Sequence, residues 1–286
     1  MTKSQSAIAY SVTGTGENLL LVHGGTGSRK HWIRNTEALA KHYRVWAIDL
    51  PGFGESPDLP PGVASEQYID YVYEQLQALP FTHEPFLLGA FSFGSVVSSG
   101  LAIKFGERLK KMSIIGPAGF GIKRAIPIDT RSMRSAGNSL EAQNEVMRHN
   151  LKAIMLYYPE SITDEMLAMH RVHINETRFD SRPLSLSSLL LANLKQVRCP
   201  LQILWGEHDQ YAHPHLKARM QLTQDALPSA TLQMIARAGH WAQYENAPAT
   251  NEAMLHFFQA LSNLHTQQTS FFKPTEAIDL IPRFTP

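Results

Sequence analysis

The sequence predicts an α/β fold, with a mostly parallel, doubly wound sheet and a helical segment inserted into it. Short apolar runs alternate with stretches of helical spacing, and connections of this kind make successive strands parallel, with helices on both faces. The chain has 286 residues, of which 43% are hydrophobic and 18% charged, so it can bury a large core. Strand-like runs disappear between about residues 121 and 197, where one helical pattern follows another. This break predicts the insertion.

The first part of the chain contains five expected strands. Their apolar runs suit strands that are buried on both faces, and they are Ala7–Val12, Leu19–Val22, Val45–Ile48, Phe86–Phe91 and Met112–Ile115. The stretches between them have helical spacing, over Trp32–His42, over Ser65–Leu79 and from Ser95 to about Phe105. Strand and helix therefore alternate as far as residue 120.

The inserted segment is expected to be helical throughout. Helices are predicted over Ser139–Tyr158 and Thr163–Thr177, each opening on a Ser or Thr that can cap it, and over Leu184–Leu194. The alternation then resumes with strands Leu201–Trp205 and Thr231–Ile235 and helices Leu216–Leu227 and Pro248–Leu264. We therefore expect a core of residues 1–120 and 198–286, and a lid of residues 121–197. The last 20 or so residues carry no clear pattern.

Charge and composition argue against several classes of partner. The formal net charge is +1, which gives no basis for electrostatic binding to nucleic acid or to an anionic membrane. A single cysteine, Cys199, permits neither an internal disulfide nor a cysteine zinc cluster. The start of the chain is polar, and no apolar run approaches the roughly 18 residues of a membrane span. We expect a cytoplasmic protein that acts on a small molecule, with a homo-oligomer left open.

One stretch suggests a nucleophile. Ser92 follows the apolar run that begins at Phe86, and a helical pattern follows it. Small residues stand two before and two after the serine, at Ala90 and Gly94, where a sharp strand-to-helix turn needs close packing. This is the pattern of a nucleophile elbow, although a buried serine in an ordinary turn has the same local sequence. The rest of the chain decides between the two interpretations.

Two further reactive residues follow the ends of later strands. Asp209 comes after Leu201–Trp205, and His240 comes after Thr231–Ile235. Open α/β sheets place their sites at the carboxyl ends of parallel strands, so Ser92, Asp209 and His240 are expected to meet there. Serine needs a base to become a nucleophile, and an acid can orient the histidine that serves as the base. Glu207 is an alternative acid, two residues before Asp209.

These pieces together resemble the α/β-hydrolase family over nearly the whole chain. The matching motifs are His23-Gly24-Gly25, Asp49-Leu50-Pro51-Gly52-Phe53-Gly54-Glu55-Ser56, Ala90-Phe91-Ser92-Phe93-Gly94, Trp205-Gly206-Glu207-His208-Asp209 and Gly239-His240-Trp241. The resemblance implies a catalytic triad of Ser92, Asp209 and His240. It also implies an oxyanion hole made by the backbone N–H of Gly25 or Thr26 and that of Phe93. His23 is expected to support its loop.

A narrower resemblance is to the meta-cleavage-product hydrolases, which cleave a carbon–carbon bond. It is carried by Gly116–Gly121, by Ser161–Leu167 in the lid and by Gly239–Glu245, with Trp32 and Asn35 after the oxyanion loop. In that family a lid arginine holds the carboxylate of a dienoate substrate. Here the best-aligned residue is His170, with Arg171 next to it. The resemblance makes these residues the candidate substrate contacts: Asn35, Phe91, His170, Arg171 and Trp241.

No cofactor or metal is expected. The glycines near Gly25 and Gly52 fit neither a dinucleotide fingerprint nor a phosphate-binding loop. The spacing of His208, His213 and His215 matches no standard ligand pattern. Lid methionines and Arg124 are further possible pocket residues, although packing and exposed charge are their alternative roles.

The sequence thus favours a cofactor-free serine hydrolase that acts on a small, largely apolar carbonyl compound. Carbon–carbon bond cleavage is the leading subtype, and a carboxylesterase or lactonase with the same triad is the alternative. A non-hydrolytic binding protein or a lyase on the same scaffold stays open. Haloalkane dehalogenation is disfavoured, because it needs a carboxylate where Ser92 stands.

Overall fold

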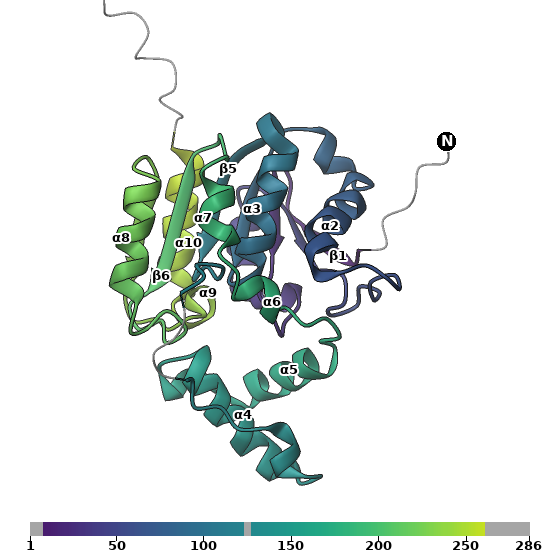
Figure 1. Cartoon of the computed structure of the whole chain (residues 1–286), viewed down its shortest axis with the longest axis vertical. Helices are drawn as coiled ribbons and strands as arrows, with labels where there is room; N and C mark the ends of the chain where they lie inside the picture. The colour runs from purple at the N-terminus through teal and green to yellow at the C-terminus, as the bar shows by residue number, and fades with distance from the viewer. Residues whose placement is uncertain (1–7, 123–126, 261–286) are drawn as a thin grey trace, which may run out of the picture.

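A computed structural model describes residues 8–122 and 127–260, in which a seven-stranded sheet is covered by helices on both faces (Figure 1). The strands are β1 (Tyr10–Thr13), β2 (Asn18–Val22), β3 (Arg44–Ile48), β4 (Phe86–Phe91), β5 (Leu109–Ile115), β6 (Leu201–Gly206) and β7 (Thr231–Ile235). Their order in the sheet is β1-β3-β2-β4-β5-β6-β7, and only the edge pair β1–β3 is antiparallel. The predicted mostly parallel, doubly wound sheet is confirmed.

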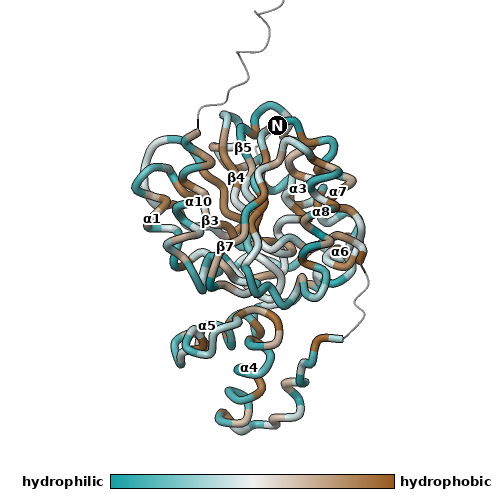
Figure 2. Tube along the Cα trace, turned by 90° about the vertical axis from the view of Figure 1, so that its left-hand side faces the viewer, coloured by the Kyte–Doolittle hydropathy of each residue, from teal (hydrophilic) through white to brown (hydrophobic). Residues whose placement is uncertain are grey.

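Alternating side chains of the buried strands form a core on each face of the sheet. In β2, Leu20 and Val22 pack on one side with α2 (Tyr68–Gln77), α3 (Phe93–Phe105) and α8 (Leu216–Ala226). Leu19 and Leu21 pack on the other side with α1 (Thr36–Ala40) and α10 (Ala247–Gln259). Figure 2 shows the apolar strands running through the middle of this body. Burial on both faces explains why these strands read as continuous apolar runs.

Most differences from the predicted elements lie at their ends. The expected helix Trp32–His42 is divided into a 3₁₀ turn, η1 (Arg29–Trp32), and α1, and the helix Ser65–Leu79 begins with a turn, η2 (Ser65–Gln67), before α2. The closing helix is preceded by α9 (Ala242–Glu245). Short 3₁₀ turns also occur at η3 (Pro80–His83), η4 (Gly106–Arg108), η5 (Met133–Ala136) and η6 (Pro159–Ser161). The spacing of apolar residues in the sequence does not show where a 3₁₀ turn replaces the end of an α-helix.

The insertion divides into two parts in the structure. Helices α4 (Leu140–Ile154) and α5 (Asp164–Asn175) lie beyond the carboxyl ends of the strands, apart from the sheet (Figure 1). Helices α6 (Arg182–Ser185) and α7 (Leu189–Leu194) return to the core, where Leu190 and Leu194 pack with the residues of α3. The side chain of Asn193 also donates to Ser99 Oγ at 3.0 Å. We use "lid helices" for α4 and α5 alone, since α7 is part of the core packing.

No helix among the described residues is long and apolar enough to cross a membrane.

Candidate active site

Ser92 lies in a strained turn between the central strand β4 and helix α3. Its backbone has φ +51° and ψ −116°, a conformation that residues with a side chain rarely adopt. Gly94 permits the turn, because a Cβ there would lie 2.3 Å from the backbone oxygen of His23. The serine side chain therefore projects from the carboxyl edge of the sheet at the start of a helix, as the elbow pattern predicts.

Ser92, His240 and Asp209 are joined by hydrogen bonds. His240 Nε2 lies 2.9 Å from Ser92 Oγ, and His240 Nδ1 lies 3.0 Å from both carboxylate oxygens of Asp209. This geometry makes Nδ1 the protonated nitrogen and leaves Nε2 to accept the serine proton. His240 and Asp209 are almost completely buried, at 1% and 0% exposure, whereas Ser92 is partly exposed.

The carboxylate of Asp209 is held in its charged form. Burial acts to raise its pKa, but the charge of His240, the hydrogen bond to His240 and the bond from the Ala212 N–H together lower the pKa below its ordinary value. The Ala212 N–H donates to Oδ1 at 2.9 Å. Glu207 does not compete for this place, because its Oε2 accepts from the Arg237 N–H at 3.2 Å on the exposed side of the loop. The structure thus favours Asp209 as the acid.

Three residues whose backbone N–H groups are unpaired in the described structure lie beside Ser92 at the cavity wall. Gly25, Thr26 and Phe93 all line the same cavity as Ser92, and no hydrogen-bond partner for their N–H groups is found among the described residues. A Cβ on Gly25 would lie only 3.6 Å from Cβ of Phe93, so the two backbone segments are close together. Thr26 has φ +48°, a strained conformation of the kind that occurs at functional loops. These groups are suited to bind developing negative charge.

A network of buried polar groups fixes the loop that carries Gly25 and Thr26. His23 lies between Gly24 and Leu50, with Nδ1 2.7 Å from the Gly24 oxygen and Nε2 accepting from the Leu50 N–H at 2.9 Å. Burial lowers the pKa of His23, so the ring is neutral and makes one bond as donor and one as acceptor. The expected supporting role of His23 fits this arrangement.

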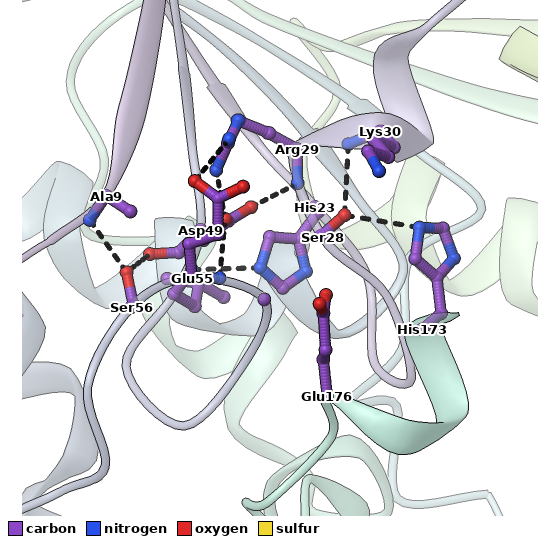
Figure 3. A network of polar contacts seen from close by, with 12 residues as sticks. Ala9, His23, Ser28, Arg29, Lys30, Asp49, Glu55, Ser56, His173 and Glu176 are labelled. Carbon is purple, nitrogen blue, oxygen red and sulfur yellow. Dashed lines mark hydrogen bonds and ion pairs between the residues drawn. The ribbon is translucent and has the colours of Figure 1, made fainter. Parts of the chain in front are cut away.

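Asp49 extends the network to the next loop (Figure 3). Its carboxylate accepts from the backbone N–H groups of Arg29 and Glu55, at 2.6 and 3.0 Å, and forms an ion pair with the Arg29 side chain. The Arg29 side chain also pairs with Glu55 at 2.7 Å. Asp49 is 1% exposed, and the positive charge and two N–H donors compensate for its burial. The conspicuous Asp49–Ser56 motif therefore supports the site and does not line the cavity.

A cavity of about 390 Å³ lies between the core and the lid helices. Ser92 and His240 open into it from the core, and its apolar wall comes mainly from the insertion, with Met133, Leu151, Ile154, Met155 and Ile174. Polar lining groups include Asn150, His170, Ser181, Arg182 and Tyr211. A volume of this size suits a small organic molecule. Met133 and Met155 thus line the pocket, while Met147 and Met166 are packed in the core.

Two lid residues expected to contact substrate behave differently. His170 lines the cavity. Arg171 does not, since its guanidinium donates to Gln143 Oε1 and Asn144 Oδ1, each at 2.5 Å, on the neighbouring helix α4. Adjacent residues of a helix point in directions about 100° apart, so His170 can face the cavity while Arg171 faces α4. Arg171 is therefore not retained as a substrate contact.

Three further expected contacts also lie away from the cavity wall. Asn35 donates to the Gln243 oxygen and Asn251 Oδ1, Trp241 donates to the His31 oxygen, and the Phe91 ring is buried beneath His240 at 5.1 Å between ring centroids. All three are fully buried. We correct their assignment from substrate contacts to supports of the loops that carry Ser92 and His240. Arg124 lies outside the described residues.

Several site residues gave no signal in the sequence. Ser181 and Tyr211 reach the cavity from irregular segments and Arg182 from the first residue of the short helix α6. His31 accepts a hydrogen bond from the Gly24 N–H at 3.1 Å. Periodicity and motif spacing do not reveal which loop residues turn inward. No cluster of three or more His, Cys, Asp or Glu suited to a metal ion occurs in ranges 8–122 and 127–260. His208 instead stacks on Tyr157, with 3.9 Å between ring centroids.

Together, the strand-end serine, histidine and aspartate under a helical lid define an α/β enzyme of the hydrolase class. The chain belongs to the alpha/beta hydrolase family, whose model matches residues 19–253.

Similar proteins include several bacterial hydrolases. A 2-hydroxy-6-oxononadienedioate/2-hydroxy-6-oxononatrienedioate hydrolase from Burkholderia vietnamiensis is 28% identical, over 88% of this chain and 91% of that protein. A 2-hydroxy-6-oxo-6-phenylhexa-2,4-dienoate hydrolase from Comamonas testosteroni is 26% identical, over 90% of this chain and 92% of that protein. The expected similarity to meta-cleavage-product hydrolases is confirmed.

Solved structures give the same fold. A meta-cleavage product hydrolase from Pseudomonas fluorescens IP01 superposes with a TM-score of 0.67 at 25% identity, over 88% of this chain and 93% of that one. An enol-lactonase from Burkholderia xenovorans LB400 superposes with a TM-score of 0.70 at 20% identity, over 88% of this chain and 96% of that one. At that identity the lactonase supports the fold alone.

Proposed function

We propose that the chain is a cofactor-free serine hydrolase that acts on a small, largely apolar carbonyl compound. The observation that carries the proposal is the position of His240, which is bonded to Ser92 through one ring nitrogen and to Asp209 through the other, at the wall of a largely apolar cavity. Two buried ionisable groups beside a strained serine are an arrangement typical of catalytic sites.

The proposed reaction has two stages. His240 takes the proton of Ser92 as the serine oxygen attacks the substrate carbonyl, and the N–H groups of Gly25 or Thr26 and Phe93 bind the oxyanion. As the tetrahedral intermediate collapses, His240 gives the proton to the leaving group. A water molecule then attacks the acyl-serine, loses its proton to His240 and regenerates Ser92. Asp209 keeps the imidazole oriented throughout.

Two bond types fit this machinery. The named relatives favour a carbon–carbon bond next to a ketone, as in the dienoates that their names describe. An ester or lactone is the second candidate. It is favoured by the cavity wall, where the one cationic side chain among the described lining residues, Arg182, is already paired with Asp180 through bonds of 2.8 and 2.7 Å.

A substrate panel tests the proposal. The purified chain and the Ser92→Ala variant are assayed with simple aryl esters, a lactone and ring-fission dienoates. The proposal expects one class to be turned over by the wild type and not by the variant. Turnover that Ser92→Ala leaves unchanged would show that the triad is not the catalytic apparatus.

A further inference from the structure

The lid side of the cavity has one polar ring without a protein partner. His170 lies on α5, is 9% exposed and lines the cavity, and no hydrogen bond of its ring is found among the described residues. Its Nδ1 is fully buried, so Nε2 is the nitrogen that a molecule in the cavity can reach. Largely buried polar side chains are normally hydrogen-bonded, and an unpaired imidazole at a cavity wall is a natural place for a ligand atom.

The other nitrogen-bearing side chains on this wall are already paired. Asn150 forms two hydrogen bonds with the backbone of Arg131, at 2.7 and 2.8 Å. Arg182 is paired with Asp180, and its side chain is 81% exposed. Arg171, next to His170, is bonded on the opposite side to Gln143 and Asn144.

His170 is a neutral group in this position. Burial lowers its pKa to about 4, and its near neighbour His173, 6.3 Å away between ring centroids, is another imidazole with a pKa lowered to about 3 by burial and by the charge that His170 would carry. His31 lies beyond His173, at 5.1 Å, and burial also keeps its pKa well below the ordinary value. No carboxylate among the described residues raises the pKa of His170 or His173. A neutral imidazole has one donor and one acceptor nitrogen and no charge to offer an anion.

We infer that His170 is a specificity-determining residue that hydrogen-bonds an uncharged oxygen of the substrate, and that the enzyme selects substrates whose lid-side end is neutral over those ending in a carboxylate. The inference rests on the proposed function, because it concerns the substrate that Ser92 attacks. An anion beside the neutral His170 would lose part of its water and gain no unpaired positive partner there, a situation that low-dielectric sites disfavour. A ketone, ether or ester oxygen would fill the vacant hydrogen bond of the ring at much lower cost.

Three matched phosphonate probes test the inference without assuming which bond is cleaved. Each carries a p-nitrophenol leaving group and an alkyl chain of the same length, ending in a methyl ester, a carboxylate or a plain methyl group. The second-order rate of p-nitrophenol release reports how well each chain end fits. If the wild type reacts with none of them, or Ser92→Ala reacts as fast as the wild type, the proposed function itself fails.

The wild type should react with the ester-ended probe at least ~10-fold faster than with the carboxylate-ended one, since about 1.4 kcal/mol gives a tenfold change. His170→Leu should lose about 2- to 10-fold with the ester-ended probe, the value of one neutral hydrogen bond, and nothing with the plain alkyl probe. His170→Arg should move the preference about 10-fold toward the carboxylate. Arg171→Gln, on the same helix but facing away, is the matched control and should keep the wild-type ratios.

Two results would overturn the inference. One is a wild type that reacts with the carboxylate-ended probe as fast as with the ester-ended probe. The other is a His170→Leu variant that keeps the wild-type ratio of ester-ended to alkyl probe. A small fluorophosphonate that does not reach the lid verifies that each variant retains a folded, reactive Ser92.

Discussion

The carboxylate of Glu245 accepts a hydrogen bond of 2.5 Å from the backbone N–H of Gly239, the residue directly before His240. The same carboxylate accepts from the N–H groups of Tyr157 and Tyr158, at 3.1 and 2.7 Å, in the segment that follows α4. The Trp241 N–H donates to the oxygen of Met155, at 2.8 Å, in the same region. The segment after α4 and the loop that carries His240 are therefore held together by the Glu245 side chain and by one backbone hydrogen bond.

Glu245→Ala should destabilise the fold and slow the site together. Three backbone N–H groups lose their acceptor, and we expect a loss of about 2 kcal/mol in the free energy of unfolding. The measurement is denaturant unfolding, combined with the rate of fluorophosphonate labelling. Glu245→Gln keeps an acceptor oxygen and should lose less, and Glu252→Ala, an exposed change on α10, is the control. If Glu245→Ala unfolds like Glu252→Ala, the carboxylate does not hold the two segments.

Asp209→Asn should lower the rate constant of the chemical step by about 10⁴-fold, as loss of the orienting acid does in triads of this kind. The amide cannot hold His240 in the tautomer that leaves Nε2 free to accept the serine proton. Glu207→Gln is the paired test of the alternative acid, and its rate should stay within about twofold of the wild type, because its carboxylate contacts the Arg237 N–H and not His240. If Glu207→Gln lowered the rate constant more than Asp209→Asn, Glu207 and not Asp209 would be the acid that orients His240. Steady-state kinetics with any substrate found in the panel are sufficient.

The strain at Ser92 gives a prediction about stability. Ser92→Gly should be more stable than Ser92→Ala by about 1 kcal/mol, since glycine tolerates φ +51° and alanine does not. Both variants should be inactive. Thermal unfolding of the two proteins compares them directly, and equal melting temperatures would mean that the turn relaxes in the variants.

Stability should fall in mild acid because of the lid histidines. The folded-state pKa values of His170 and His173 are about 4 and about 3, below the value of about 6.5 for an unfolded chain. The unfolded state therefore binds more protons from pH 6.5 downward, and the stability these groups contribute is present above pH 6.5 and is lost as pH falls toward their folded values. His170→Leu should reduce the slope of stability against pH by roughly 1 kcal/mol per pH unit between pH 6 and 4. Unfolding curves at several pH values measure it, and a slope identical to the wild type's would show that His170 is not buried as a neutral ring.

The sequence predicted the sheet correctly, because buried strands and small residues at a sharp turn give recognisable patterns along the chain. Buried parallel strands give apolar runs, and the elbow needs small residues at Ala90 and Gly94. We expected Ser92, Asp209 and His240 to lie close together because each follows a parallel strand, and the carboxyl ends of parallel strands share one edge of the sheet.

The substrate wall could not be derived in the same way. Asn35 and Trp241 were expected at the substrate, but their polar atoms bond to the backbone of Gln243 and His31 inside the core. Whether His170 or Arg171 faces the cavity depends on the rotation of one helix, which is set by packing between α4 and α5. The return of α7 to the core depends in the same way on the contacts of Leu190 and Leu194. These placements are set by contacts between distant parts of the chain, and no pattern in the local sequence reveals them.

The most direct test of the account is to label the purified chain with a fluorophosphonate, map the modified residue by mass spectrometry and compare His240→Gln with the wild type. We predict one modified residue, Ser92, with labelling absent in Ser92→Ala and slowed at least ~100-fold in His240→Gln, the scale of a lost general base. An unlabelled wild-type protein, or a label on another residue, would contradict the assignment of Ser92 as the nucleophile.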